Sequence, residues 1–245
     1  MEVSKKILFI KDWVLNYVNS MPKKAESLVI GISGGIDSSV TSTLCAMTSI
    51  KTIILTMPIN QISSQHNLRL KHEKCLKNKF KNVESHTIEL NEVFKSFQSK
   101  LLSFDNKHGL ANSRARIRMT TLYQVAAANN GIVVGTGNKL EDFGVGFYTK
   151  YGDGGVDISP IADCTKTEVW EIGKELKVLE EIIEAQPTDG LWDDGRTDVG
   201  QLGLTYQELE DAMNNPTSTH RSKYLEKRKL NLHKMESIPV CKITK

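Results

Sequence analysis

Apolar positions along the chain alternate between short runs of strand length and longer stretches with a helical period. The strand-like runs cover residues 27–32, 52–57, 85–88 and 132–135, and the helical stretches cover 1–20, a segment from about Ser38, 63–78 and 111–129. Glycine often follows the last residue of a helix, so we expect Gly131 to close the helix of residues 111–129. This alternation is typical of right-handed βαβ units, which form a parallel sheet covered by helices. The pattern predicts an α/β fold with three layers, and we expect residues 1–245 to form a single domain.

The predicted sheet indicates where a ligand would bind. In open parallel sheets, ligands lie beyond the carboxyl ends of the strands, so the residues after Ile32, Met57 and Gly135 are candidates. Two glycine-rich segments, residues 144–155 and 187–203, interrupt the pattern. Long segments of this kind inside a compact domain are usually either lids or disordered. Because both are dense in charge, we interpret them as lids that close over a charged ligand.

Composition narrows the classes of partner. The net charge is +3, from 32 basic and 29 acidic residues, which is too balanced to indicate a nucleic-acid-binding surface. The chain lacks a run of about 18 apolar residues that could span a membrane. Its first twenty residues form an amphipathic pattern without the apolar core of a signal peptide. The four cysteines form no Cys-x-x-Cys pair, which favours reduced thiols. We therefore expect a cytoplasmic protein with neither a nucleic-acid nor a membrane partner.

The most specific motif runs from Gly31 to Ser39, between a predicted strand and a predicted helix. Gly34 and Gly35 can adopt positive φ and let the backbone approach a ligand closely. The following helix N-terminus offers free N–H groups and a positive dipole end, which suit an oligophosphate. Asp37 would repel a phosphate unless a cation lay between them, so it indicates bridging Mg²⁺. The loop lacks the Gly-Lys-Ser/Thr ending of a Walker loop. The plainer alternative is a glycine-rich turn with an Asp/Ser cap.

The segment Ser33–Ser38 resembles the loop of the N-type ATP pyrophosphatases, which cleave ATP between the α and β phosphates. Residues 115–119, 135–138, 146–155, 187–188 and 233–234 further resemble NAD synthetase, and the resemblance extends from Gly31 to about Lys234. It implies a Rossmann-like ATP pyrophosphatase fold. It also implies an enzyme that adenylates the carboxylate of deamido-NAD with ATP and passes it to ammonia, giving NAD, AMP and pyrophosphate.

The resemblance also implies roles for individual residues. Asp37 and Glu141 resemble magnesium ligands, and Lys166 and Asp153 resemble catalytic groups, Asp153 as the residue that receives and deprotonates ammonium. The ATP-binding set comprises Gly31, Ile32, Ser33, Gly34, Gly35, Ile36, Asp37, Ser38, Thr136, Lys166 and Thr188. The set that resembles contacts to the dinucleotide comprises Arg116, Lys150, Asp157, His233 and Lys234.

These residue types suit the implied chemistry. A carboxylate that attacks an α-phosphate brings two anions together, so lysine and Mg²⁺ are needed to offset their repulsion. Ammonia at neutral pH is mostly ammonium, which a nearby carboxylate could bind and deprotonate. Closed lids would keep water away from the acyl-adenylate.

Several assignments have plainer readings. Arg116 and Arg118 could form a solvated helix edge, and Glu141 could cap or pair near a helix start. His233 and Lys234 lie in a basic stretch where a surface charge run is the default. The alternative functions are a GMP synthetase-like enzyme, a tRNA-thiolating enzyme and a non-catalytic nucleotide-binding domain. The last of these has no need of Asp37 paired with Glu141.

The sequence departs from the family pattern at one point. After Thr136, many members carry Asp-His, whereas this chain has Gly137, Asn138 and Lys139, which leaves the contacts of Asn138 and Lys139 open. The synthetase motif begins at Gly31 and leaves no room before it for an amidase domain. Free ammonia is therefore the expected nitrogen donor, supplied directly or by a separate glutaminase. The resemblance also implies a homodimer with substrate sites near the interface.

Overall fold

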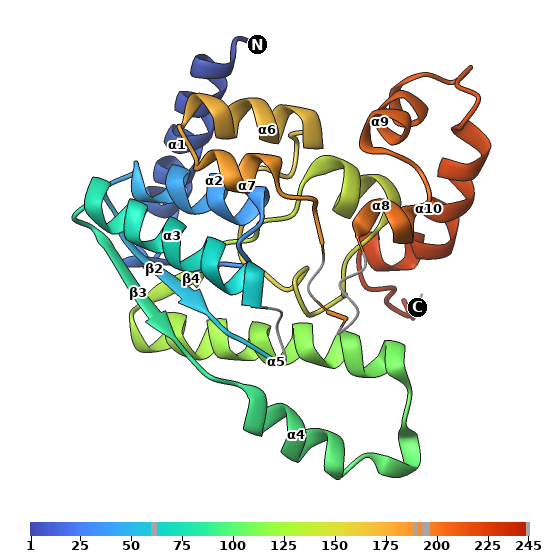
Figure 1. Ribbon diagram of the computed structural model, residues 1–245, viewed down its shortest axis with the longest axis horizontal. Coiled ribbons are helices and arrows are strands. Elements are labelled where there is room, and N and C mark those ends of the chain that lie inside the picture. Colours follow the sequence, from blue (N-terminus) through green and yellow to red (C-terminus); the bar gives the residue numbers. More distant parts are fainter. Residues whose placement is uncertain (60–62, 189–190, 193–196, 244–245) are drawn as a thin grey trace.

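The computed structural model describes residues 1–59, 63–188, 191–192 and 197–243, and for residues 63–66 it describes only the backbone. Figure 1 shows its elements, which are α1 (Val3–Ser20), β1 (Ser27–Gly31), α2 (Ile36–Ala46), β2 (Lys51–Thr56), α3 (Ser63–Lys79), β3 (Val83–Thr87), α4 (Asn91–Ser99), the 3₁₀ helix η1 (Leu102–Phe104), α5 (Lys107–Ala128), β4 (Gly131–Val133), the π-helix η2 (Lys139–Val145), α6 (Lys166–Glu175), α7 (Glu180–Glu184), α8 (Asp198–Leu202), α9 (Tyr206–Asn214) and α10 (Arg221–Met235).

The four strands form one parallel sheet with the order β3-β2-β1-β4. The chain moves outward from β1 through β2 to β3, then crosses back through α5 to place β4 on the other side of β1. The direction of winding therefore reverses between β1 and β4. A reversal of this kind opens a crevice at the carboxyl ends of the two strands, where α/β proteins bind ligands.

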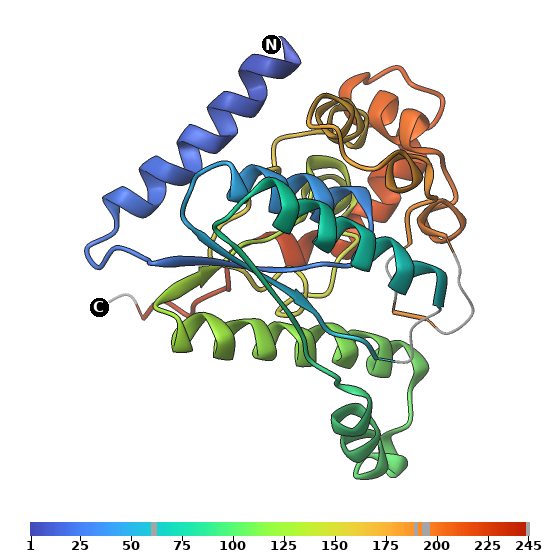
Figure 2. The ribbon, with the colours of Figure 1, turned by 60° about the vertical axis from the view of Figure 1, so that its left-hand side comes forward.

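Helices cover both faces of the sheet, as the sequence predicts. Helices α1, α2 and α3 lie on one face and α5 lies along the other (Figure 2). Leu28 and Ile30 pack into the cluster that includes α1 and α2, whereas Val29 and Ile53 pack into the cluster that includes α5. Strands buried on both faces are expected to be almost wholly apolar. Full burial of each such side chain contributes about 1.5–3 kcal/mol.

A further apolar cluster forms beside the sheet. Leu140 of η2 packs with Leu204, Leu209 and Tyr224, which belong to or flank α9 and α10. In Figure 1 these C-terminal helices lie together at one side of the sheet. This cluster holds η2 in place, and η2 carries Glu141.

The prediction that Gly131 closes the preceding helix is wrong. Asn130 adopts the left-handed conformation with φ of 47°, and Gly131 is the first residue of β4. Glycine is required at position 131 for a different reason. A Cβ there would lie 2.2 Å from the Ser27 hydroxyl oxygen and 2.9 Å from the Ser27 carbonyl oxygen. Because Gly131 has no side chain, β4 can approach β1 closely.

Other element boundaries differ by a few residues from those expected. Helix α2 begins at Ile36, and α5 begins at Lys107, where the Asn106 side chain accepts a hydrogen bond from the Gly109 amide at 2.8 Å. Of the second predicted lid, residues 187–203, positions 189–190 and 193–196 lie outside the described residues. Across the described helices, none combines the length and apolar character needed to cross a membrane.

The buried side chain of His72 predicts a pH dependence of stability. It is 2% exposed, its Nε2 lies 2.9 Å from the Ser42 hydroxyl, and burial lowers its pKa to about 4. Above pH 6.5 the imidazole is neutral in both states. Below pH 6.5 the unfolded chain binds a proton that the folded chain does not take up until about pH 4. We expect His72 to reduce the free energy of unfolding by about 2 kcal/mol between pH 8 and pH 5.

Urea unfolding at the two pH values measures this effect. The His72→Gln variant should lack this component, because glutamine cannot bind the proton. His86, whose side chain is 56% exposed, gives the matched control, and His86→Gln should retain the full pH difference. Identical pH differences in the wild type and His72→Gln would contradict the expected role of His72.

Candidate functional site

A cleft of about 270 Å³ opens at the carboxyl ends of β1, β2 and β4. Its walls come from segments far apart in the sequence, namely the β1–α2 loop, the ends of β2 and β4, α5, η2 and the start of α6. The candidate positions after Ile32, Met57 and Gly135 therefore converge. The cleft residues from the predicted sets are Gly31, Ile32, Ser33, Gly34, Gly35, Ile36, Asp37, Ser38, Thr136, Glu141, Asp153, Lys166 and Thr188.

Hydrogen bonds made by its own serines fix the conformation of the β1–α2 loop. Gly34 has φ of 90°, a conformation that favours glycine, whereas Gly35 has φ of −86° and serves as the N-cap of α2. The Ser33 and Ser38 hydroxyls lie 3.1 Å apart, and the Ser39 hydroxyl donates to the Gly35 carbonyl at 2.9 Å. The loop thus presents the N-terminal amides of an eleven-residue helix to the cleft, as an anion site requires.

Two carboxylates and one lysine meet beside this loop. The Lys166 ammonium donates to Asp37 at 2.5 Å and to Glu141 at 3.1 Å. The Asn138 amide also donates to both carboxylates, at 3.1 Å to Asp37 and 2.6 Å to Glu141. Tyr206 donates its hydroxyl to Glu141 at 2.6 Å. These five side chains come from α2, η2 and its N-cap, α6 and α9, so tertiary packing alone brings them together.

Burial makes these charges strongly interdependent. The Lys166 side chain is only 2% exposed. Burial would lower its pKa, but the two carboxylates outweigh that effect and raise the pKa of Lys166. Burial, together with the charge of Glu141, raises the pKa of Asp37 despite the opposing charge of Lys166. Burial and the neighbouring acids also raise the pKa of Tyr206, so its hydroxyl remains a hydrogen-bond donor.

The donor set suits a magnesium ion. Mg²⁺ prefers hard oxygen ligands and is usually held by one or two carboxylates together with substrate phosphates. Asp37 and Glu141 provide two carboxylates that converge on one point beside the phosphate-binding loop. Among the described residues, no group of three or more acidic, histidine or cysteine side chains forms a complete metal site. A metal here would therefore take its remaining ligands from water or phosphate oxygens.

Asn138 and Tyr206 are functional candidates that sequence reasoning missed. Asn138 is fully buried, and its carbonyl oxygen also accepts from the amides of Leu140 and Glu141. Its place after a strand, three residues before Glu141, was a usable signal. Nothing in the pattern around Tyr206 indicated a contact with η2. Lys139 has a separate role, because its ammonium lies 2.8 Å from the exposed Asp163 carboxylate.

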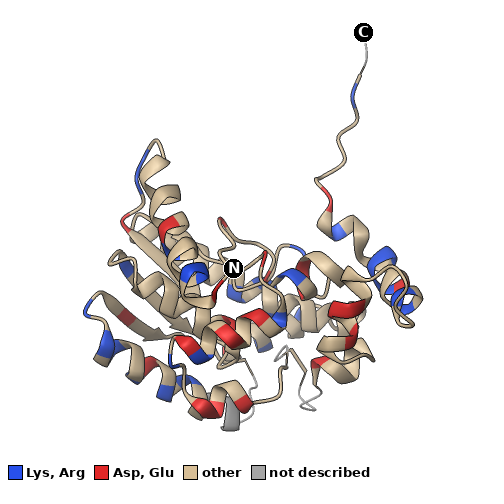
Figure 3. Cartoon of the chain, turned by 90° about the horizontal axis from the view of Figure 1, so that it is seen from above, with Lys and Arg blue, Asp and Glu red and all other residues tan. Residues whose placement is uncertain are grey.

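Four residues from the predicted dinucleotide-binding set gather near one another. Arg116 donates to the Lys150 carbonyl at 3.2 and 3.3 Å, and Lys150 donates to the His233 carbonyl at 3.1 Å. Lys234 donates to the Tyr148 carbonyl at 2.8 Å and lies over the Tyr148 ring. They form a basic group that joins α5, the 146–155 segment and α10. Figure 3 shows further Lys and Arg residues along α10, with the chain beyond it extending away from the body.

The fifth residue of that set lies elsewhere. Asp157 accepts from the Val133 amide at 2.7 Å and from the Tyr123 hydroxyl at 3.1 Å, so it ties the chain after β4 to α5. On α5, Arg118 lines the cleft and donates to the Met57 carbonyl at 3.0 Å, whereas Arg116 is exposed outside it.

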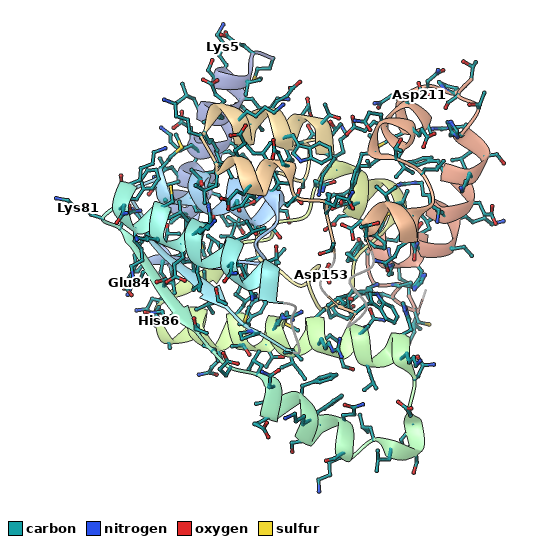
Figure 4. All side chains as sticks on the ribbon, in the orientation of Figure 1. Lys5, Lys81, Glu84, His86, Asp153 and Asp211 are labelled. Atoms are coloured by element: carbon teal, nitrogen blue, oxygen red, sulfur yellow. The ribbon has the colours of Figure 1, made fainter. Side chains whose placement is uncertain are left out.

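Two further acids line the cleft beyond Glu141. Asp153 accepts from the Thr149 amide at 2.9 Å, and Figure 4 labels it above α5 near the centre of the view. Asp142 lies against Gly137, where a Cβ would come within 1.9 Å of its Oδ2 atom. Burial, followed by the charges of Asp153 and Glu141, raises the pKa of Asp142. Gly137, where the chain departs from the family pattern, thus leaves room for the Asp142 carboxylate.

Comparison with known proteins shows the family. The family model described as NAD synthase matches residues 6–244. The NH(3)-dependent NAD(+) synthetase of Mesoplasma florum is 39% identical over 206 residues, which cover 81% of this chain and 81% of that protein. The solved structure of NMN synthetase from Francisella tularensis has a TM-score of 0.91 and 31% identity, and the match covers 99% of this chain and 100% of that one.

A second solved structure supports the same grouping. The NH3-dependent NAD synthetase of Campylobacter jejuni, in complex with the nitrate ion, is 26% identical, with a TM-score of 0.79 and coverage of 99% and 100%. These matches extend over the phosphate loop, η2 and the C-terminal helices. The chain belongs to the NAD synthase family.

Proposed function

We propose that the protein is a ligase that uses ATP and Mg²⁺ to amidate deamido-NAD with ammonia, through an acyl-adenylate, and so completes NAD synthesis. The observation that carries this proposal is the cluster of Asp37, Glu141 and Lys166 beside the β1–α2 loop. An ATP-binding loop alone would suit many functions. A buried lysine and two carboxylates at the same loop suit the joining of an anionic acid to an anionic phosphate.

Each part of the cleft has a distinct task in this reaction. The loop from Gly31 to Ser38 would bind ATP phosphates through backbone amides and serine hydroxyls, with Thr136 and Thr188 as further ATP contacts. Lys166 would stabilise negative charge that develops at the α-phosphate. The basic group of Arg116, Lys150, His233 and Lys234 would bind the anionic substrate, and Asp153 would receive the nitrogen donor.

Magnesium would be held by Asp37 and Glu141. When bound, it supplies positive charge that offsets the repulsion between the phosphates and the attacking carboxylate. Lys166 now contacts both of these carboxylates, so it is positioned to exchange that contact for one to phosphate oxygens. Asn138 keeps the two carboxylates oriented through its hydrogen bonds to both.

The products of turnover test the proposal. With deamido-NAD, ammonium, ATP and Mg²⁺, we expect AMP and pyrophosphate, because attack at the α-phosphate releases the β and γ phosphates together. Chromatography of the nucleotides distinguishes AMP from ADP. Formation of ADP would overturn the mechanism. Turnover with xanthylate but not with deamido-NAD would instead overturn the substrate assignment.

A specific observation favours a second candidate substrate, the mononucleotide of nicotinic acid. The structural neighbour described above with a TM-score of 0.91 is an NMN synthetase, and its identity to this chain is 31%. Both substrates present the same carboxylate and differ in the adenylate half. Measuring kcat/KM for the two in competition decides between them, and a preference for the mononucleotide of tenfold or more, about 1.4 kcal/mol, would replace deamido-NAD as the assigned substrate.

Three further expectations belong to the proposal. We expect residues 1–245 to act as one synthetase domain and two copies to form a homodimer, which sedimentation at enzyme concentrations would detect. We also expect the protein to work in the cytoplasm with small-molecule substrates, without a nucleic-acid or membrane partner.

A further inference from the structure

Asp142 is a cleft residue to which neither the sequence nor the proposed mechanism assigns a role. It follows Glu141 in η2, and its carboxylate lines the cleft. Among the described residues, no group donates a hydrogen bond to this carboxylate. The backbone amide of Asp142 is already used, since it donates to the Asn138 carbonyl at 3.1 Å. A carboxylate without a protein donor at the wall of a binding cleft is suited to a ligand that carries donors.

Steric fit fixes where this carboxylate lies. A Cβ on Gly137 would meet the Asp142 carboxylate at 1.9 Å for Oδ2, 2.4 Å for Cγ and 3.0 Å for Oδ1. All three distances are shorter than ordinary contact, so the carboxylate occupies the space that a side chain at position 137 would fill. The Asp142 carboxylate therefore fits in this position because residue 137 has no side chain.

The surrounding charges favour a cation at this point. Asp142 and Asp153 both line the cleft, so two acidic residues border the same space. Lys234 interacts electrostatically with both acids and also donates to the Tyr148 carbonyl at 2.8 Å, so it offsets only one of the two negative charges. Lys166 is engaged by Asp37 and Glu141.

We propose that Asp142, together with Asp153, binds the nitrogen donor as ammonium in the cleft. This inference rests on the proposed amidation, in which a small cation with four N–H donors must enter a site that also holds anions. Ammonium is the main form of ammonia at neutral pH, and carboxylate oxygens are its natural acceptors. Asp142 acts here by charge and position, before the nitrogen loses its proton.

Substitution of Asp142 by asparagine tests the assignment, because it keeps the shape and removes the charge. In Asp142→Asn we expect the KM for ammonium to rise at least about tenfold, as for the loss of one charge-assisted hydrogen bond. The kcat at saturating ammonium should stay within about twofold. ATP–pyrophosphate exchange without ammonium and the Mg²⁺ concentration for half-maximal rate should not change, since neither involves the nitrogen donor.

A neutral nucleophile separates ammonium binding from later steps. Hydroxylamine is uncharged at pH 8, so Asp142→Asn should form the hydroxamate at nearly the wild-type rate. An unchanged KM for ammonium would overturn the proposal. So would a shift in the Mg²⁺ requirement, or an equal loss with hydroxylamine and in ATP–pyrophosphate exchange. A wild-type protein that releases no AMP would instead remove the proposed function itself.

Position 137 provides an independent variant pair in case Asp142→Asn fails to fold. Gly137→Ala should raise the KM for ammonium without removing any charge, because the new Cβ displaces the carboxylate. The double variant Gly137→Asp with Asp142→Ala places a carboxylate in the same space from the other residue, and should recover a lower KM than Asp142→Ala alone. No recovery would count against the proposal. Asp163→Asn, which removes a 96% exposed carboxylate, is the matched control and should leave the KM unchanged.

Discussion

Replacement of Asp37 by asparagine is expected to lower turnover at least about 1000-fold, or about 4 kcal/mol of transition-state stabilisation, while the protein folds normally. Asparagine keeps the shape but loses the charge that would hold magnesium against the phosphates. The fold should survive because Lys166 keeps its contact with Glu141 at 3.1 Å. Burial also disfavours the charged form of Asp37, so a neutral side chain is tolerated there.

Steady-state kinetics and ATP–pyrophosphate exchange measure this effect. Both activities should fall together in Asp37→Asn, because the magnesium site would serve the adenylation step. This pattern differs from that expected for Asp142→Asn, which should affect only ammonium. Asp12→Asn on α1, where the side chain is 58% exposed, controls for the loss of one negative charge. Near-wild-type exchange in Asp37→Asn would remove the magnesium assignment.

Replacement of Lys166 by methionine is expected to abolish turnover and also to lower the free energy of unfolding by about 3–5 kcal/mol. Two carboxylates, 19% and 13% exposed, would then face each other without the ammonium that now contacts both. Removal of one partner from a buried ion cluster costs more than loss of a surface pair, since the remaining charges stay buried and uncompensated. Chemical denaturation measures the difference.

Added magnesium provides a second measurement on the same variant. If Asp37 and Glu141 hold the metal, Mg²⁺ should restore part of the lost stability in Lys166→Met, because it neutralises the same carboxylates. Lys139→Met is the matched control. Its partner Asp163 is almost fully exposed, so stability should change by no more than about 0.5 kcal/mol. A Lys166→Met protein as stable as wild type would show that Lys166 does not neutralise the two carboxylates.

Much of the fold could be predicted from local sequence pattern. The apolar runs from Leu28 and from Thr52 became β1 and β2, because a strand buried on both faces needs continuous apolar residues. Errors arose where two backbones meet. Gly131 looked like a helix terminator, but its role depends on the close approach of Ser27, which is more than 100 residues away in sequence. No local pattern contains that contact.

The candidate site divides in the same way. The loop from Gly31 to Ser38 could be recognised because its function depends on consecutive residues between one strand and one helix. Tyr206 could not be assigned from the sequence, since tyrosine is common and its partner Glu141 lies 65 residues away on another element, whereas Asn138 could have been flagged from its place beside Glu141. Nothing in the sequence pattern indicated a role for Asp142, because the position of its carboxylate depends on the missing side chain of Gly137.

The sequence by itself determined the parallel α/β architecture and the phosphate loop, because both follow from the spacing of neighbouring residues. It also carried the resemblance that predicted Glu141 and Lys166 as site residues. Only the tertiary structure decided that Lys166 meets Asp37 across 129 residues of chain and contacts both carboxylates at once. The physical reason is that side-chain charges interact over a few ångströms. The packing of α6 against α2 and of η2 against α9 and α10, rather than any periodic pattern, decides which charges come that close.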